Sequence, residues 1–254
     1  MINKDTLIKT FITAGYAAFM LYLLMTDRIA MYVHPKMNRY VLACALLLIV
    51  ITLVISKDLF SHTHSHKGLG FYSIFLIPLL LGFFIQPVSL ASVVAQNRGV
   101  TINKKATNST GILSKQNDTV VIQEVDKKEY EMKISGDEII VTDRNYINTL
   151  DKLFMDTKKY ENKTIELTGF VFRDKDFNDT SFIAARSLIT CCAADTSIVG
   201  LICEYNDGKQ LKNDTWIKVK GKIKDTSFNG QQMPMIVVEK CEEIEKPKNE
   251  YIYP

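Results

Sequence analysis

Three long apolar runs, separated by short polar segments, occupy the first hundred residues of the chain. They cover residues 6–25, 40–56 and 69–95. A helix that crosses a bilayer needs about 20 mostly apolar residues. The pattern therefore predicts a transmembrane region over residues 1–96 with three spanning helices.

A cleaved signal peptide is the alternative explanation for the first run. Its apolar core is too long for a signal peptide, no small-residue cleavage site follows it, and a second apolar run comes soon after. We therefore expect a multi-pass membrane protein in contact with lipid. Lys and Arg near the ends of the runs favour a cytoplasmic second half, by a margin too small to fix its side.

A different pattern begins after residue 160, where apolar and polar residues alternate with the period of two that is typical of strands. Gly169 and Gly221 lie in the middle of two such segments and indicate bulges or strong coiling. Five strands with these glycines favour a small closed barrel of the OB type, and a two-sheet sandwich is the alternative. The predicted strands are 163–173, 181–189, 198–205, 216–224 and 235–244.

Residues 143–160 precede the barrel and have apolar residues at helical spacing, with Thr142 or Asp143 available as the N-cap. Short strands are expected at 119–125 and 138–142.

The domain boundaries follow from composition. Residues 97–134 are rich in polar residues in their first part and have no helical period, which predicts a linker with a short strand. Residues 135–254 form the predicted soluble β domain.

Charge is divided unevenly between the two halves. Residues 1–96 contain seven Lys/Arg and three Asp/Glu, which leaves 24 basic and 25 acidic residues for the rest. A second half this balanced gives no electrostatic reason to expect a nucleic acid as partner.

The most unusual chemistry is the adjacent pair Cys191-Cys192, followed by Ala-Ala and Asp195. On a strand, the two thiols would point to opposite faces, one toward the core and one outward. Neighbouring cysteines rarely bond each other, so a metal, a redox reagent, a distant cysteine or burial must account for the pair. Thiolates select soft or borderline ions such as Zn²⁺ and Cu⁺. With Cys203 or Cys241, the motif could form a metal site, with zinc as the candidate ion, but core filling is the favoured explanation for these two cysteines.

Arg186 lies on the predicted strand that leads into the pair. It could lower the pKa of a thiol, hold Asp195 in place, or form only a structural ion pair with that carboxylate.

A second candidate metal site is the loop between the second and third apolar runs. His62, His64 and His66 alternate there, so an extended segment would place all three imidazoles on one face. They could also collect metal loosely, or be ordinary polar loop residues.

An enzyme is not expected. All four histidines lie in the first half, so the predicted β domain lacks the commonest general base. The chain has neither a glycine-rich phosphate loop nor an H-E-x-x-H motif. A thiol-redox protein remains a distant alternative.

Longer motifs carry a resemblance to a known family. They are N-R-G after the third run, Y-x-x-K-x-I-x-L-x-G-F-V, and A-R-x-x-I-T-C-C-A-A-D. The chain resembles the bacterial YcgQ-type family, whose members are described as permease subunits that accompany a separate polytopic permease. The family's marked positions correspond to Gly169, Phe170, Arg186, Cys191, Cys192, Asp195, Gly200 and Trp216.

The resemblance implies an accessory subunit of a two-component permease in the bacterial cell membrane, with a larger polytopic subunit as its partner. The cysteines add the hypothesis that the complex handles a soft or borderline metal ion. The alternative is a membrane-anchored envelope protein, unconnected with transport, that binds a partner through its β domain.

Overall fold

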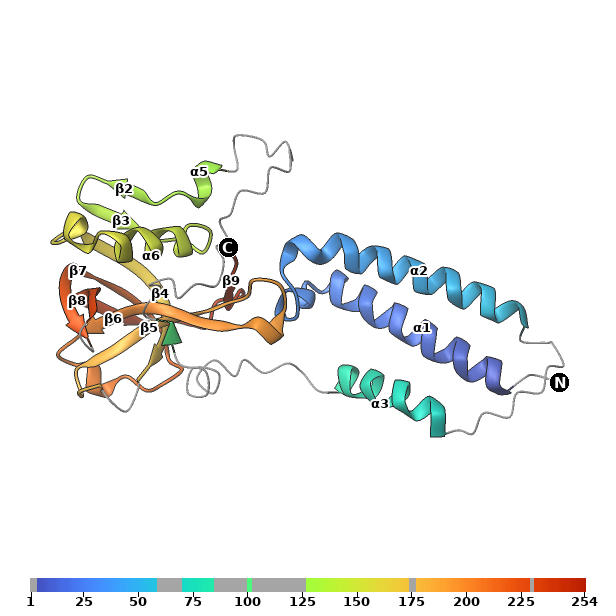
Figure 1. The fold of residues 1–254 in the computed structure, drawn as a ribbon. Helices are drawn as coiled ribbons and strands as arrows, with labels where there is room; N and C mark the ends of the chain where they lie inside the picture. The colour runs from blue at the N-terminus through green and yellow to red at the C-terminus, as the bar shows by residue number, and fades with distance from the viewer. Residues whose placement is uncertain (1–3, 59–69, 85–99, 102–126, 174–176, 229–230) are drawn as a thin grey trace. The chain divides into compact units, whose positions relative to one another are not determined.

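The computed structural model describes residues 4–58, 70–84, 100–101, 127–173, 177–228 and 231–254. The chain divides into two compact units. The first contains Met1–Val88 and the short segment Cys191–Ala193; the second contains Ser89–Thr190 and Ala194–Pro254. The described part of the first unit is mainly helical, whereas strands dominate the second (Figure 1). The fold therefore changes from helical to mainly β along the chain, as the sequence predicts.

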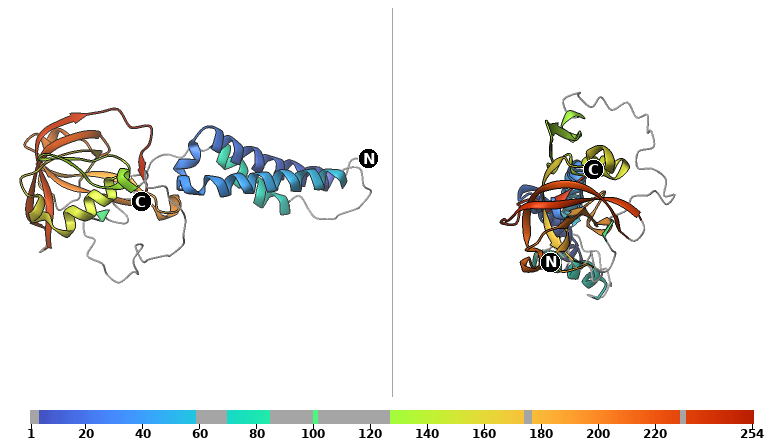
Figure 2. Two further views of the ribbon diagram at one scale, coloured as in Figure 1. Left: turned by 90° about the horizontal axis from the view of Figure 1, so that it is seen from above. Right: turned by 90° about the vertical axis from the view of Figure 1, so that its left-hand side faces the viewer.

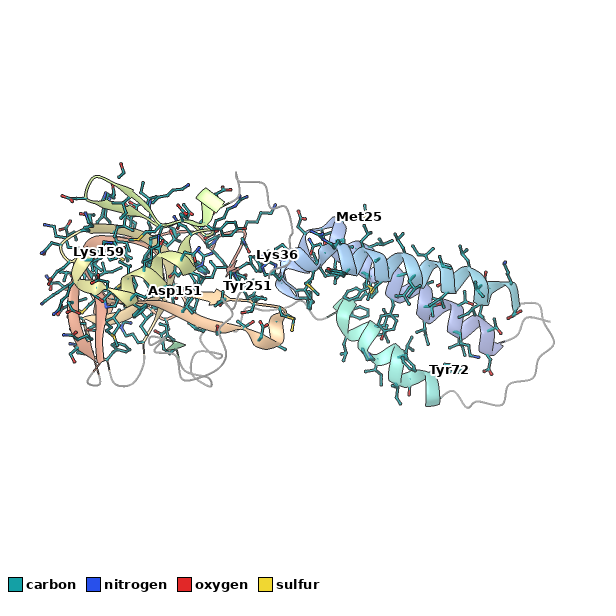
Figure 3. All side chains as sticks on the ribbon, turned by 45° about the horizontal axis from the view of Figure 1, so that its top comes forward. Met25, Lys36, Tyr72, Asp151, Lys159 and Tyr251 are labelled. Carbon is teal, nitrogen blue, oxygen red and sulfur yellow. The ribbon has the colours of Figure 1, made fainter. Side chains whose placement is uncertain are left out.

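Two long helices account for the first two predicted spans. They are α1 (Lys4–Met25) and α2 (Asn38–Lys57), and the connection between them contains the 3-10 turns η1 (Arg28–Met31) and η2 (Pro35–Met37). Both helices are long and apolar enough to cross a membrane. Most of their side chains end in carbon, as Figure 3 shows along both helices. Such surfaces suit contact with lipid.

The third predicted span is described only in part. Helix α3 (Gly70–Phe84) has 15 residues and contains Pro78. At 1.5 Å per residue it is about 22 Å long, shorter than the roughly 30 Å hydrocarbon core of a bilayer. Residues 85–95 of the predicted span lie outside the described residues. Two long candidate spans are therefore present, and the third span stays a prediction.

Hydroxyl groups join the three helices. Thr52 of α2 donates a hydrogen bond from Oγ1 to Oγ1 of Thr13 in α1, at 3.0 Å. The Tyr16 hydroxyl of α1 donates to the Phe75 carbonyl of α3, at 2.8 Å. Such bonds between membrane helices stabilise packing by about 0.6 kcal/mol each. They tie both α2 and α3 to α1.

A closed barrel forms the core of the second unit. Its strands are β4 (Thr164–Phe172), β5 (Ser181–Leu188), β6 (Ser197–Glu204), β7 (Trp216–Phe228) and β8 (Gln231–Glu243). The order around the barrel is β4, β5, β6, β8 and β7, which returns to β4. Every pair is antiparallel except β6–β8, which is parallel. This five-stranded mixed barrel, also visible in Figure 2, confirms the predicted barrel and replaces the sandwich alternative.

Two mid-strand glycines allow the barrel strands to approach closely. A Cβ atom at Gly169 would lie 2.7 Å from the carbonyl oxygen of Ala185, and one at Gly221 would lie 2.1 Å from that of Val237. The β7–β8 register also shifts between Lys220 and Gly221, which confirms the expected irregularity there. Only a residue without a side chain fits these two positions.

Short strands extend the sheet beyond the barrel. The hairpin β2 (Lys133–Ser135) and β3 (Glu138–Ile140) joins it through a parallel β3–β4 pair. Parallel pairs also attach β1 (Val100–Thr101) to β6 and β9 (Tyr251–Ile252) to β5. Strand β3 matches a predicted strand, whereas the one predicted at 119–125 lies outside the described residues. Short helical turns are α5 (Lys127–Tyr130), η5 (Ala193–Asp195) and η6 (Gly208–Gln210).

The predicted helix before the barrel is present as α6 (Tyr146–Met155), followed by η4 (Thr157–Tyr160). Its N-cap residue is Asn145, so the expectation of Thr142 or Asp143 at the cap is wrong. The Asn145 side chain accepts the Thr142 N–H at 2.7 Å and thereby forms a turn that delays the start of the helix. The helix packs one face into the larger of two apolar clusters in the barrel domain.

Candidate functional site

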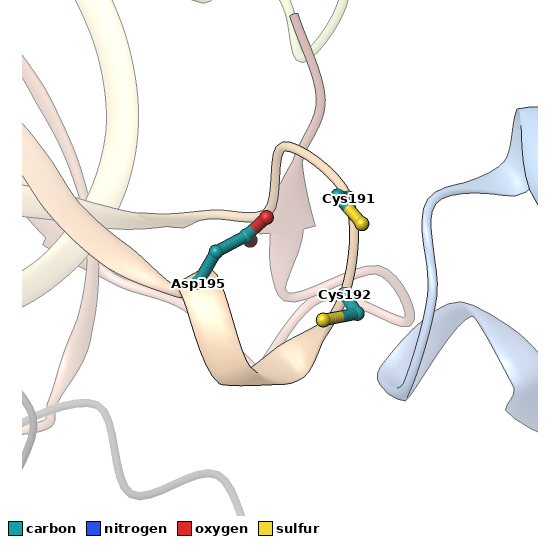
Figure 4. Close-up of side chains that lie close together, drawn as sticks. All are labelled: Cys191, Cys192 and Asp195. Atoms are coloured by element: carbon teal, nitrogen blue, oxygen red, sulfur yellow. The ribbon is translucent and has the colours of Figure 1, made fainter. Parts of the chain in front are cut away.

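Cys191 and Cys192 lie in the connection between β5 and β6. Regular strand structure ends at Leu188, and the chain then turns through η5 before β6 begins. Cys191 and Asp195 are exposed, and Cys192 is partly buried. Figure 4 shows the three side chains around this single turn.

A local hydrogen bond holds Asp195 against the start of the turn. Its Oδ1 accepts the N–H of Thr190 at 3.1 Å. Aspartate side chains commonly stabilise turns by accepting a nearby backbone N–H. As a result, the sulfur atoms of Cys191 and Cys192 and a carboxylate oxygen of Asp195 all lie within 4.8 Å of one another.

The expectation that one of the two thiols points into the core is wrong, because Cys191 is exposed and Cys192 is only partly buried. It assumed that the extended segment continued through both cysteines. The strand stops at Leu188, and the 3-10 turn begins at Ala193, directly after Cys192. The alternation of a strand therefore no longer applies, and both sulfur atoms belong to one cluster.

Backbone hydrogen bonds hold the cysteine segment within the first unit. The carbonyl of Cys191 accepts the N–H of His34 at 3.0 Å, and the N–H of Ala193 donates to the carbonyl of Tyr32 at 2.7 Å. The main chain on both sides of Cys192 is thus fixed. The sequence gives no signal for these contacts, because they join residues about 160 positions apart by backbone atoms alone.

Strand β9 pairs with the end of β5, just before the cysteine turn. It runs parallel to the end of β5, with Ser187 opposite Tyr251 and Leu188 opposite Ile252. The N–H of Ile189 donates to the carbonyl of Ile252 at 3.1 Å. Residues 187–189, which precede the turn, are therefore paired with β9.

Arg186 has its partners in other segments of the chain. Its Nη1 is 2.8 Å from Oδ1 of Asp143, and its Nη2 donates to the carbonyl of Asn249 at 3.3 Å. The arginine is therefore paired with Asp143 and not with Asp195, contrary to the expectation from sequence. The reason is that Arg186 belongs to the regular part of β5, where its side chain enters the interior and is 2 % exposed.

Two aromatic rings contact the buried guanidinium. Its central carbon lies 5.3 Å from the ring centre of Trp216 and 6.0 Å from that of Tyr146. Burial raises the pKa of Tyr146, and the charge of Arg186 opposes part of that rise. Trp216 in turn packs edge-on against Phe170, with ring centres 5.8 Å apart. Three of the positions marked by the family resemblance are thus part of the domain interior.

The two later cysteines are also interior residues. Cys203 is fully buried and Cys241 is partly buried against the same apolar cluster. Burial raises the pKa of the Cys203 thiol, and it raises that of Cys241 to about 11 with help from Glu243 and Glu242. Among the described residues, neither joins the Cys-Cys-Asp group. Core filling, the favoured explanation, fits both.

The predicted histidine site at His62, His64 and His66 lies outside the described residues. The remaining histidine, His34, is buried, and its Nδ1 accepts the N–H of Lys36 at 3.0 Å. Among the described residues, Cys191, Cys192 and Asp195 are thus the group with the spacing of metal ligands.

The spacing of this group fits a small metal ion. Around a tetrahedral ion with Zn–S bonds of about 2.3 Å, neighbouring sulfur ligands lie roughly 3.8 Å apart. The three donor atoms lie within 4.8 Å of one another, so their largest separation exceeds this value by at most about 1 Å. Two thiolates and one carboxylate are all ligands that zinc accepts.

The chain combines two candidate membrane spans with a mixed β-barrel whose β5–β6 turn carries Cys191, Cys192 and Asp195. These features define a class of candidate membrane proteins with a β-barrel domain. Two family models match the chain: the DUF1980 N-terminal domain over residues 8–101 and the DUF1980 C-terminal domain over residues 115–254. The chain therefore belongs to the DUF1980 family. This confirms the resemblance found in the sequence.

Two curated relatives support the assignment. A Streptococcus mutans protein named "Putative two-component membrane permease complex subunit" is 25% identical over 271 residues, covering 97% of this chain and 99% of the relative. The Bacillus subtilis protein named "UPF0703 protein YcgQ" is 25% identical over 194 residues, covering 72% of this chain and 67% of the relative.

Proposed function

We propose that this protein is a non-enzymatic accessory subunit of a two-component permease in the bacterial cell membrane. The name of the Streptococcus mutans relative, which aligns over nearly the full length of both chains, supports this proposal. The two candidate spans of the first unit agree with it. Because a few apolar helices with few polar side chains cannot line a pathway alone, the partner is a larger polytopic subunit.

The subunit's task is to handle a soft or borderline metal ion at Cys191, Cys192 and Asp195. The observation that carries this proposal is the mutual approach of the three donor atoms to within 4.8 Å. Thiolate ligands select such ions over Mg²⁺ and Ca²⁺, which take oxygen ligands. All three residues come from one turn, so a single loop supplies the ligands.

The barrel supports this task by holding the loop. The five barrel strands pair in the order β4, β5, β6, β8 and β7, and β7 pairs back with β4. This order supports the OB-like type expected from the sequence. The cysteine turn connects the second and third of these strands. Strands β5 and β6 pair with each other as far as Leu188 and Ser197, and β9 pairs with the end of β5, so the ends of the turn are held by backbone pairing.

A co-purification experiment tests the proposal. The tagged full-length protein is extracted from its native membrane in mild detergent, and its partners and metal content are measured. We expect a polytopic membrane protein at constant ratio, and a soft or borderline metal that is lost in the Cys191→Ser/Cys192→Ser variant but kept in Cys241→Ser. A lone chain without a membrane partner would contradict the subunit role.

The alternative, an envelope protein unconnected with transport, predicts a different result. In that case the partner would be a soluble or envelope protein, and deleting the gene would leave the cellular content of metals unchanged. Metal content is therefore measured in the deletion strain alongside the co-purification.

A further inference from the structure

We propose that the Cys191–Cys192–Asp195 group is a three-ligand transfer site for a divalent ion of the zinc class. The ion's fourth ligand comes from outside this turn. This inference rests on the proposed metal-handling function, and it specifies both the ion and the way in which the ion is held.

The mixture of ligands identifies the class of ion. Cu⁺ is selected by sites built from soft thiolate and thioether sulfur, whereas Mg²⁺ and Ca²⁺ need several oxygen ligands. Two sulfur atoms beside one carboxylate oxygen suit neither Cu⁺ nor Mg²⁺ or Ca²⁺. Zinc binds cysteine, histidine and carboxylate ligands in one tetrahedral site, so it matches this mixed set.

The number of ligands indicates exchange. Structural zinc sites are closed by four protein ligands, whereas sites with three protein ligands keep one position for water or another molecule. Within the described part of the chain, the group has three members. An ion held there has a coordination position that an incoming ligand can take.

Exposure points in the same direction. Cys191 and Asp195 are exposed and Cys192 is partly buried, so an ion can enter and leave without opening the barrel. The hydrogen bond from Thr190 to Asp195 places the carboxylate before the ion arrives. The turn therefore combines a preformed arrangement with an accessible ion, which is what passage from one protein to another requires.

The first measurement determines the ion. The full-length protein in detergent is titrated with Zn²⁺ and, under reducing conditions, with Cu⁺, each against a chromogenic chelator. We expect one Zn²⁺ per chain. Asp195→Asn should weaken Zn²⁺ binding by at least about tenfold, because it removes a direct ligand, and should leave Cu⁺ affinity nearly unchanged. The matched controls Asp207→Asn and Cys241→Ser should bind Zn²⁺ like the wild type.

The second measurement determines whether a coordination position is open. Co²⁺ is bound in place of Zn²⁺ because its visible spectrum reports the ligands and their number. Adding imidazole should change the spectrum of an open site and leave that of a closed four-ligand site unaltered. The same titration on the variant with His62, His64 and His66 all replaced by alanine should give the wild-type result.

The outcomes separate this inference from the proposed function. An unchanged spectrum with imidazole, or loss of the site in the triple histidine variant, would overturn the open position. Tight Cu⁺ binding with equal Zn²⁺ affinity in Asp195→Asn would overturn the zinc class while keeping a metal role. Failure to bind either ion would overturn the proposed metal handling itself.

Discussion

Arg186 and Asp143 form an ion pair of 2.8 Å in which the arginine side chain is 2 % exposed and the aspartate side chain is 51 % exposed. Removing one partner of a buried pair leaves an uncompensated charge and costs about 3–5 kcal/mol. Because water reaches Asp143, we expect Asp143→Asn to lower the free energy of unfolding by only about 1–3 kcal/mol. Urea unfolding of the full-length protein, followed by the fluorescence of Trp216, measures this change.

A surface ion pair provides the control for this experiment. Asp137 is 93 % exposed and pairs with Lys163 at 3.1 Å. We expect Asp137→Asn to cost less than about 1 kcal/mol. Equal losses in the two variants would show that Arg186 does not depend on its carboxylate partner.

The close approach at Gly221 predicts a large effect of one methyl group. In Gly221→Ala the new Cβ would lie 2.1 Å from the carbonyl oxygen of Val237, so the β7–β8 pair must separate. The control is Gly136→Ala, where φ is +61° and no atom lies within 4 Å of the added Cβ. Conformational strain alone costs roughly 1–2 kcal/mol at such a position. Thermal unfolding by circular dichroism should show a larger drop in melting temperature for Gly221→Ala than for Gly136→Ala. A smaller drop would contradict the close approach of β7 and β8 at Gly221.

The hydrogen bond between α1 and α3 predicts a small effect in the first unit. Tyr16→Phe removes the hydroxyl that donates to the Phe75 carbonyl and keeps the ring. We expect a loss of about 0.6 kcal/mol, and at most about 1.7 kcal/mol, in thermal unfolding of the full-length protein in detergent. Tyr22→Phe, on the same helix, is the control. An identical melting temperature in wild type and Tyr16→Phe, with a shift in Tyr22→Phe, would argue against the α1–α3 contact.

The buried thiols predict a loss of stability at alkaline pH. Burial raises the pKa of Cys203, and raises that of Cys241 from 9.0 to about 11. Above about pH 9 the unfolded chain releases these protons before the folded chain does, so unfolding becomes more favourable as pH rises. Each thiol contributes a slope of up to about 1.4 kcal/mol per pH unit in this range. The free energy of unfolding, measured from pH 8 to pH 11, should fall less steeply in Cys203→Ala/Cys241→Ala than in wild type.

A control separates this effect from the titration of other groups. Val219 of the same apolar cluster, which carries no titratable group, is replaced in a third variant, Val219→Ala, whose pH slope should match that of wild type. If the double variant keeps the full slope, tyrosines or lysines are responsible instead.

Much of the fold can be predicted from local pattern. Apolar runs of sufficient length indicate α1 and α2, alternation indicates β4 and β7, and short apolar segments between turns indicate the other three barrel strands. Gly169 and Gly221 indicate where strands approach or bulge, because no other residue fits there. These features are predictable since each depends on neighbours a few positions away in the sequence.

The site depends on features that local pattern does not contain. Strand alternation predicts divergent thiols, but β5 ends three residues before Cys191, and the turn brings both thiols toward Asp195. Arg186 looks close to Asp195 in sequence, yet its partner Asp143 comes from the segment before the barrel. The two-residue strand β9 is too short for any alternation to identify it. In each case a tertiary contact decides the outcome.

The pairing of β8 with both β6 and β7 determines when the barrel can close during synthesis of the chain. The barrel cannot close until β8 has been synthesised, because β8 bridges β6 and β7. At about 5–20 residues per second, residue 243 is added roughly 10–40 s after residue 57 at the end of α2. Both candidate spans are thus complete while the later strands still lack their partners. The barrel then closes only after both candidate spans have been made, and its open strand edges must be kept from other chains until β8 arrives.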